Sequence, residues 1–293
     1  MSVRANRGLD LTRPDLVTDD EIAAFRAAYG ATHGKALDAY ELWLTFNPSV
    51  VKRHRLQAYW TTDPDEPAYP AKSILGYLYL YTILGYGEGI RYEASHAHDL
   101  GLPAVAVLQV LELAFIRSGP RGMDAAWQSA RTQIADSAAN SGDVSSLFPP
   151  GWTADPDRFD CGCVPLEPDL SAAEETGIRR WYTDLCGEVP SGVTLLMATR
   201  PGLLKAYHLR LHAAMRGPLP VQLWAFMEVQ AAAGTSNAPA LRRAIAVARG
   251  LGLTRADVVE AVGWGMQYSG PEVFDVAADV IDRVFSAPDR ALA

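Results

Sequence analysis

The chain contains two similar copies of one segment about 150 residues apart, and this internal repeat limits the folds available to it. Residues 99–120 align with residues 250–271 without a gap, and the same register continues as far as residues 126 and 277. The identical pairs in the gap-free part include Leu100/Leu251, Gly101/Gly252, Leu102/Leu253, Val107/Val258, Ser118/Ser269, Gly119/Gly270 and Pro120/Pro271. Upstream, with a two-residue slip, residues 47–56 align with residues 200–209. Matching blocks in the same order predict two copies of one structural unit.

Apolar spacing and helix-end signals predict helices almost throughout the chain. The clearest expected helices are 20–29, 35–46, 71–84, 103–117 and 254–268. Thr254 and Asp257 stand at capping-box spacing, and Gly119-Pro120 ends one helix and starts the next. No segment alternates strand with helix as a nucleotide-binding fold does. The expected fold is therefore all-α, with two helical repeats packed about a pseudo-twofold axis.

The repeat divides the chain into four expected parts. Residues 1–46 form N-terminal helices, 47–137 the first repeat, 138–198 a linker with a connecting helix, and 199–293 the second repeat. The linker is rich in Ser, Asp, Gly and Pro, and Ser171 and Glu174 form a capping box at the start of its helix. A linker of this length indicates either a functional flap or a strap across an interface.

Composition excludes several classes of protein. A hydrophobic content of 49% with 20% charged residues is typical of a globular protein with an ample core. The net charge of −8 argues against nucleic acid or an anionic membrane as the main partner. The apolar runs are too short for a membrane span, and the N-terminus lacks a secretory signal pattern. Three cysteines favour a reducing compartment over a disulfide scaffold, so we expect a cytoplasmic protein.

The repeated block of helix, Gly-Leu turn, helix and Ser-Gly-Pro resembles the carboxymuconolactone decarboxylase family, which includes the AhpD-like alkylhydroperoxidases. The matching segments in the second half are RPGLLKAY, PLPVQLWAFMEVQAAAG and GLGLTRADVVEAVGWGMQYSGPEVFDVAADVI. The resemblance covers about residues 47–130 and 199–286. It implies an all-helical, oligomeric enzyme without a bound organic cofactor.

The chain departs from the peroxidase members of that family at their active-site motif, Cys-x-x-Cys-x-x-x-His. Counting back from the two Gly-Leu turns, the motif positions fall on Gly85, Glu88 and Tyr92 in one repeat and on Ser236, Pro239 and Arg243 in the other. Thiol peroxidase chemistry requires a low-pKa thiol and a resolving partner. A thiol peroxidase is therefore not expected, whereas the decarboxylase type of member works without paired thiols.

Three residues near these motif positions are the expected catalytic group. Glu88, Tyr92 and His96 are spaced four residues apart and so lie on one side of a helix. A carboxylate near an imidazole can act as an acid/base pair, and Tyr92 can orient a substrate oxygen. The alternative is that Glu88 and His96 only complement the helix dipole. The neighbouring Arg91 and Glu93 are expected to be solvated.

Five further residues are expected to contact a substrate. Tyr77 and Tyr81 offer aromatic surface, although core packing is the alternative for each. Glu228 is a single charge in an apolar segment, so it must be paired or functional if it is buried. Arg243 and Lys52 are cations that can hold a substrate carboxylate, although Lys52 also fits an exposed helix face.

No metal site or organic cofactor is expected. His208 and His212 share a helix face at metal-ligand spacing, but no motif supplies further ligands, so a solvated or interfacial pair is favoured. Phosphate-binding loops, nucleophile elbows and hydride-cofactor motifs are missing from the sequence.

The sequence thus predicts a cofactor-independent enzyme with acid/base chemistry on a small carboxylated or aromatic-derived compound. Decarboxylation, lactone opening or a related lyase or hydrolase step would fit. The alternative is a non-catalytic binding or assembly protein that kept the fold after losing the redox thiols. We expect a small-molecule substrate, no nucleic acid or membrane partner, and a homo-oligomer.

Overall fold

The computed structural model describes residues 7–33, 38–61, 70–140 and 142–286, and within these ranges it is helical without any strand. The first half holds α2 (Asp19–His33), α3 (Asp38–Phe46), α4 (Pro48–Thr61), α5 (Pro70–Leu84), α6 (Gly87–Asp99), α7 (Ala104–Ser118) and α8 (Pro120–Asp136). The second half holds α9 (Ala172–Cys186), α10 (Ser191–Thr199), α11 (Pro201–Ala214), α12 (Val221–Gly234), α13 (Ala238–Gly250), α14 (Arg255–Ser269) and α15 (Val273–Ser286). The predicted all-α class is confirmed for the described residues.

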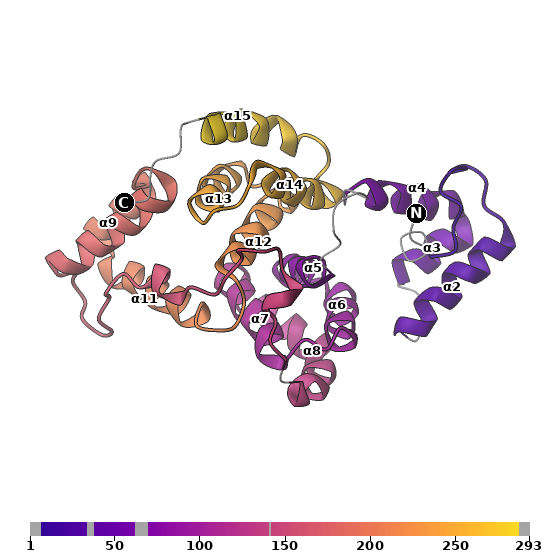
Figure 1. Cartoon of the computed structure of the whole chain (residues 1–293), viewed down its shortest axis with the longest axis horizontal. Helices are drawn as coiled ribbons and strands as arrows, with labels where there is room; N and C mark the ends of the chain where they lie inside the picture. Colours follow the sequence, from indigo (N-terminus) through magenta and orange to yellow (C-terminus); the bar gives the residue numbers. More distant parts are fainter. Residues whose placement is uncertain (1–6, 34–37, 62–69, 141, 287–293) are drawn as a thin grey trace.

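Helices α5 and α12 lie in the middle of the molecule and pack against each other (Figure 1). Both are apolar on nearly all sides, which fits helices that are surrounded by others. The bundle α2–α4 lies at one end of the molecule, and α9 and α11 lie at the other (Figure 1). None of the described helices is long and apolar enough to cross a membrane.

Helix ends follow the signals in the sequence. Ser171 caps α9 and Thr254 caps α14, and both form the predicted capping boxes with an acidic residue three positions later. Pro120 is the first residue of α8 and follows Gly119, whose φ of +63° suits glycine. The second half differs, because α15 begins at Val273 instead of directly at the proline.

Each half contains a buried lysine that joins one helix to an earlier helix of the same half. Lys52 in α4 is fully buried, and its Nζ lies 2.7 Å from Glu21 and 2.6 Å from the carbonyl oxygen of Leu16. Lys205 in α11 is 2% exposed, and its Nζ lies 2.8 Å from Glu174. Neither lysine lies on an exposed helix face. Lys52 joins α4 to α2, and its buried Nζ is not placed to hold a substrate carboxylate as expected.

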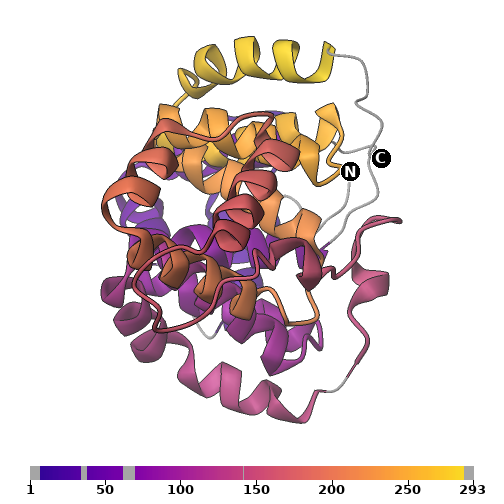
Figure 2. The same ribbon diagram turned by 90° about the vertical axis from the view of Figure 1, so that its left-hand side faces the viewer.

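The segment between the halves is packed onto the body of the protein. It contains three short 3₁₀ helices, η1 (Ser137–Ala139), η2 (Ser145–Leu147) and η3 (Pro156–Phe159). Val144, Phe148, Trp152 and Phe159 are buried in the main hydrophobic core. Figure 2 shows this segment passing along the outside of the helices. The linker was expected to be either a functional flap or a strap across an interface. Because its side chains are buried in the main core, the structure favours the strap.

Candidate active site

Helix α6 carries a charged residue on its buried side. Ile90, Ala94 and Ala97 form an apolar stripe at helical spacing, and Glu93 lies within that stripe. Glu93 is 6% exposed, so the expectation that it is solvated is wrong. A buried carboxylate is unfavourable unless it is paired, hydrogen-bonded or neutralised.

Glu93 is paired with His96, one turn later on α6. The Nδ1 atom of His96 lies 3.3 Å from Oε2 of Glu93, and the imidazole packs edge-on against the Tyr92 ring with centroids 4.4 Å apart. Burial raises the pKa of the Glu93 carboxyl, and this effect outweighs the opposing influence of His96 and Arg7. The side chain of His96 is 20% exposed, so the imidazole links the buried carboxyl to solvent.

Tyrosines from α5 and α14 form a cluster near this pair. We call Tyr77, Tyr81 and Tyr268 the phenol cluster. The hydroxyls of Tyr81 and Tyr268 lie 2.5 Å apart, and the amide of Gln267 donates to the Tyr77 hydroxyl at 2.6 Å. Tyr77 also stacks on Trp264 with an interplanar angle of 8°. Helix α14 therefore supplies one side of a site whose other side comes from α5.

The electrostatics connect the phenol cluster with Glu93. Burial raises the pKa of Tyr77, Tyr81 and Tyr268, and the Glu93 carboxylate raises each further. The phenols therefore stay neutral and keep their protons for donation. Neutral phenols beside a protonatable carboxyl can stabilise an oxyanion while the carboxyl transfers a proton.

The close approach of α5 to α6 depends on one glycine. A Cβ atom on Gly89 would lie 2.6 Å from the Tyr81 ring and 2.5 Å from the Tyr86 ring. Any larger residue at position 89 would push these rings away. Gly89 therefore fixes where the Tyr81 hydroxyl sits relative to α6.

The other two members of the predicted stripe have different neighbours. The Glu88 carboxylate accepts a hydrogen bond from the backbone N–H of Asp38 at 3.1 Å, so it joins α6 to the start of α3. Tyr92 accepts a hydrogen bond from Arg7 at 2.5 Å and stacks on Tyr29. Among the contacts of the described residues, His96 pairs with Glu93, whereas Glu88 reaches the start of α3.

The predicted site residues of the second half lie elsewhere. The Glu228 carboxylate on α12 is 15% exposed and accepts hydrogen bonds from Tyr79 on α5 and Arg117 on α7. Glu228 raises the pKa of Arg117. Arg243 lies on the exposed side of α13. A buried Glu228 was expected to be either paired or functional, and the structure shows that it is paired.

The two histidines of α11 have different neighbours. His208 is 2% exposed, so of the two expected alternatives, solvated or interfacial, the solvated one is wrong for this residue, and its Nδ1 lies 3.4 Å from the Cys161 sulfur. His212 lies 3.8 Å from Asp160 instead. Within the described residues, no group of three or more His, Cys, Asp or Glu side chains could hold a metal ion.

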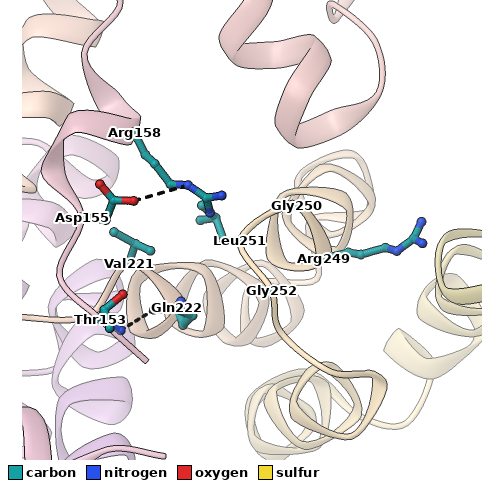
Figure 3. A pocket seen from close by; sticks show the side chains of 9 residues that line it. All are labelled: Thr153, Asp155, Arg158, Val221, Gln222, Arg249, Gly250, Leu251 and Gly252. Carbon is teal, nitrogen blue, oxygen red and sulfur yellow. Dashed lines mark hydrogen bonds and ion pairs between the residues drawn. The ribbon is translucent and has the colours of Figure 1, made fainter. Parts of the chain in front are cut away.

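A pocket of about 350 Å³ lies at the start of α12, away from the phenol cluster. Its lining residues are Thr153, Asp155, Arg158, Val221, Gln222, Arg249, Gly250, Leu251 and Gly252. Figure 3 shows that Arg158 pairs with Asp155, that Thr153 bonds Gln222, and that the Arg249 side chain points away. Several polar side chains of this pocket are thus engaged in hydrogen bonds or ion pairs with one another, and we do not assign a catalytic role to them.

The sequence reasoning missed three residues of the candidate site: Glu93, Gln267 and Tyr268. Glu93 was detectable, because its position in an apolar stripe with Ile90 and Ala97 marks it as buried. Gln267 and Tyr268 come from α14, about 190 residues away from α5 in the chain, and no local pattern reports that contact.

Comparisons of the chain with protein-family models, with curated proteins and with solved structures found no match.

Proposed function

We propose that this protein is an enzyme that performs acid/base chemistry on a small carboxylated or aromatic-derived compound without an organic cofactor. The Glu93–His96 pair beside the phenol cluster carries this proposal. The proposal includes the resemblance to the carboxymuconolactone decarboxylase family, two copies of one helical unit, and self-association into a homo-oligomer.

The helix boundaries support a duplication that is longer than the matching sequence blocks. Helices α9, α10 and α11 begin and end 153 positions after α2, α3 and α4. Helices α13 and α14 begin and end 151 positions after α6 and α7. The proposed units are therefore α2–α8 and α9–α15, which draws the N-terminal helices and the connecting helix into the repeats.

The buried lysines support the same pairing. Lys52 and Glu21 correspond to Lys205 and Glu174 at the offset of 153, and both pairs are buried ion pairs. The sequence alignment alone matches the two lysines. The structure adds that each lysine pairs with a glutamate at the equivalent position of its own half. Two such arrangements are hard to explain by chance in unrelated bundles.

Reciprocal contacts support a pseudo-twofold axis between the units. At the offset of 151, Tyr77 corresponds to Glu228 and Arg117 to Tyr268. Tyr77 contacts Tyr268, with ring centroids 6.2 Å apart, and Glu228 pairs with Arg117. In a twofold arrangement a contact between i and j is repeated between their equivalents, as it is here. The two equivalent places carry different chemistry, phenols in one and an ion pair in the other.

In the proposed reaction the phenol cluster stabilises the negative charge that develops on the substrate, and Glu93 donates the proton. In a decarboxylation the bond to the carboxylate breaks, CO₂ leaves, and the electron pair passes into an enolate. Tyr81 and Tyr268 donate hydrogen bonds to the enolate oxygen, and Glu93 in its protonated form, which burial favours, protonates the carbon. His96 then restores the proton from solvent. The matching positions in the other unit, Ala244 and Val247, carry no acid/base group.

The proposal is tested by turnover of a panel of small β-keto acids, unsaturated lactones and aromatic carboxylates, followed by CO₂ release and ultraviolet absorbance. For a compound that is turned over, Glu93→Gln should lower kcat by about 10²-fold or more, because it removes the proton donor. His96→Ala should give a loss of similar order. Glu112→Gln, an exposed carboxylate on α7, should leave kcat unchanged.

Glu88→Gln distinguishes the two carboxylates of α6. An amide at position 88 still accepts the Asp38 N–H, so this variant should stay close to wild-type activity. Loss of turnover in Glu88→Gln with full activity in Glu93→Gln would reject the assignment of Glu93. Tight binding of a panel compound without any conversion would instead favour a non-catalytic binding protein.

A further inference from the structure

Gln267 on α14 joins the end of α4 to the phenol cluster. Its Nε2 atom donates one hydrogen bond to the Thr61 hydroxyl at 3.2 Å and another to the Tyr77 hydroxyl at 2.6 Å. The Thr61 hydroxyl in turn donates to the backbone carbonyl oxygen of Gln57, which lies 2.9 Å away. One chain of hydrogen bonds therefore links α4, α14 and α5.

The Thr61 hydroxyl sets the direction of this chain. A hydroxyl has a single proton, and the proton of Thr61 is used on the Gln57 carbonyl oxygen, which can only accept. Thr61 can therefore only accept from Gln267, so the Gln267 amide must present its nitrogen and not its oxygen. Because the same nitrogen contacts Tyr77, the Tyr77 hydroxyl must accept as well.

The proton of the Tyr77 hydroxyl is left over, because Tyr77 accepts from Gln267. Within the part of the chain that the structure describes, this hydroxyl has no acceptor for its proton. The Tyr77 ring is held in place, since it stacks on Trp264 with centroids 5.5 Å apart and lies nearly parallel to Tyr81, at an interplanar angle of 25°. Tyr77 therefore offers a free O–H donor from a fixed position.

The other two phenols of the cluster are bonded to each other. The hydroxyls of Tyr81 and Tyr268 lie 2.5 Å apart, so one donates to the other, and this bond must break before both can donate to a substrate. Tyr77 needs no such change. A donor that is already free costs no reorganisation when negative charge develops on a substrate oxygen. Tyr268 is 38% exposed, so the cluster is reached from solvent on this side.

We propose that Tyr77 is a further catalytic residue of the enzyme and that Gln267 is its positioning residue. Tyr77 donates a hydrogen bond to the oxyanion that forms on the substrate, and Gln267 occupies the lone pair of the hydroxyl so that its proton stays available. This inference rests on the proposed function, because it requires an oxyanion at the phenol cluster. The other unit has no counterpart, since Tyr77 corresponds to Glu228 and Gln267 to Ile116 at the offset of 151.

Binding of para-nitrophenol tests the inference on the full chain, because its ionised form carries an oxyanion and differs in colour from its neutral form. In absorbance titrations the wild type should bind the ionised form more tightly than the neutral form. Tyr77→Phe should weaken binding of the ionised form about tenfold, since a hydrogen bond to a charged oxygen is lost. Gln267→Met should weaken it severalfold. Gln128→Met, the same change at an exposed glutamine of α8, should bind as the wild type does.

A double variant separates positioning from a general structural effect. In Tyr77→Phe the hydroxyl on which Gln267 acts is gone, so adding Gln267→Met should weaken binding no further. Additive losses would overturn the positioning role, as would unchanged binding in Gln267→Met alone. Wild-type protein that fails to bind the ionised probe at millimolar concentration, or that binds it no better than Tyr77→Phe does, would overturn Tyr77 as an oxyanion donor.

Glu93→Gln distinguishes failure of this inference from failure of the proposed function. An amide at position 93 cannot supply the proton, but it leaves Tyr77 and Gln267 in place, so the ionised probe should bind at least as tightly as to the wild type. Probe binding that depends on Tyr77 and Gln267, without turnover of any panel compound, would reject the proposed reaction and keep the oxyanion site. For a compound that is turned over, Tyr77→Phe should lower kcat at least about tenfold and change KM much less, and an unchanged kcat would overturn its catalytic role.

Discussion

His208 illustrates how one buried side chain can make stability depend on pH. Its ring lies among Trp181, Tyr182 and Tyr207, and its Nε2 atom is buried without a hydrogen-bond partner among the described residues. Burial lowers the pKa of His208 to about 4, from an ordinary value of 6.5. The imidazole is therefore neutral in the folded protein at neutral pH.

We expect His208 to cause part of the acid denaturation. The unfolded chain takes up this proton below pH 6.5, whereas the folded chain resists it down to about pH 4. The stability linked to His208 is thus present above pH 6.5 and falls as the pH is lowered, by about 3 kcal/mol in total. Denaturant unfolding between pH 4 and pH 7 should show a flatter dependence for His208→Phe. His98→Gln, at an exposed histidine, should follow the wild-type curve. Parallel curves for His208→Phe and wild type would contradict this.

Sequence reasoning at the residue scale worked where the cause was local. His96 was predicted to lie near a carboxylate, and it does, but that carboxylate was expected to be Glu88 because a spacing of four suggested a shared helix face. Burial decided otherwise, since Glu93 faces the core and Glu88 reaches α3. Whether these residues act on a substrate stays a prediction.

At the scale of helices, ends were predictable and partners were not. Capping boxes and Gly-Pro junctions are encoded within a few residues, and α8, α9 and α14 begin where those signals stand. The partner of Lys52 lies 31 residues earlier in the chain, so no local pattern announces the ion pair with Glu21. A lysine in the helix sequence alone looks like a solvated residue.

We expect the buried lysines to be far more important for stability than the exposed charges beside them. Lys52→Ala removes the cation that pairs with the largely buried Glu21 carboxylate, so the free energy of unfolding should fall by about 3 kcal/mol. Arg53 is next in the same helix and forms an exposed pair with Asp15, so Arg53→Ala should cost about 1 kcal/mol or less. Urea denaturation measures both. Equal losses for the two variants would show that the buried pair does not anchor α4 to α2.

At the scale of the whole molecule, the two ends of the protein are built differently. The bundle α2–α4 packs around a small core of its own. Its buried members are Leu9, Leu11, Phe25, Tyr29, Leu44, Val51 and Tyr92, of which only Tyr92 comes from α6. The corresponding bundle α9–α11 shares the main core instead, through residues such as Ile178, Tyr182 and Leu211. A sequence comparison of the halves gives no sign of this asymmetry. Tyr29 and Tyr182 are the same residue type at equivalent positions, yet Tyr29 belongs to the small core and Tyr182 to the main core.

The asymmetry predicts that α2–α4 opens without the rest of the protein. A bundle with few apolar contacts to the main core can unfold locally at a lower free energy than the global transition. In native-state hydrogen exchange, backbone amides of α2 and α4 should exchange at least about tenfold faster than those of α9 and α11, a difference of about 1.4 kcal/mol in opening free energy. Lys52→Ala should enlarge the difference, since it weakens only the first bundle. Lys205→Ala, the matched change in the second bundle, should speed exchange in α9 and α11 towards the rates of α2 and α4. Equal protection of the two bundles in the wild type would mean that the contacts of Arg7 and Tyr92 join α2–α4 to α6 as firmly as the main core joins α9–α11 to α13.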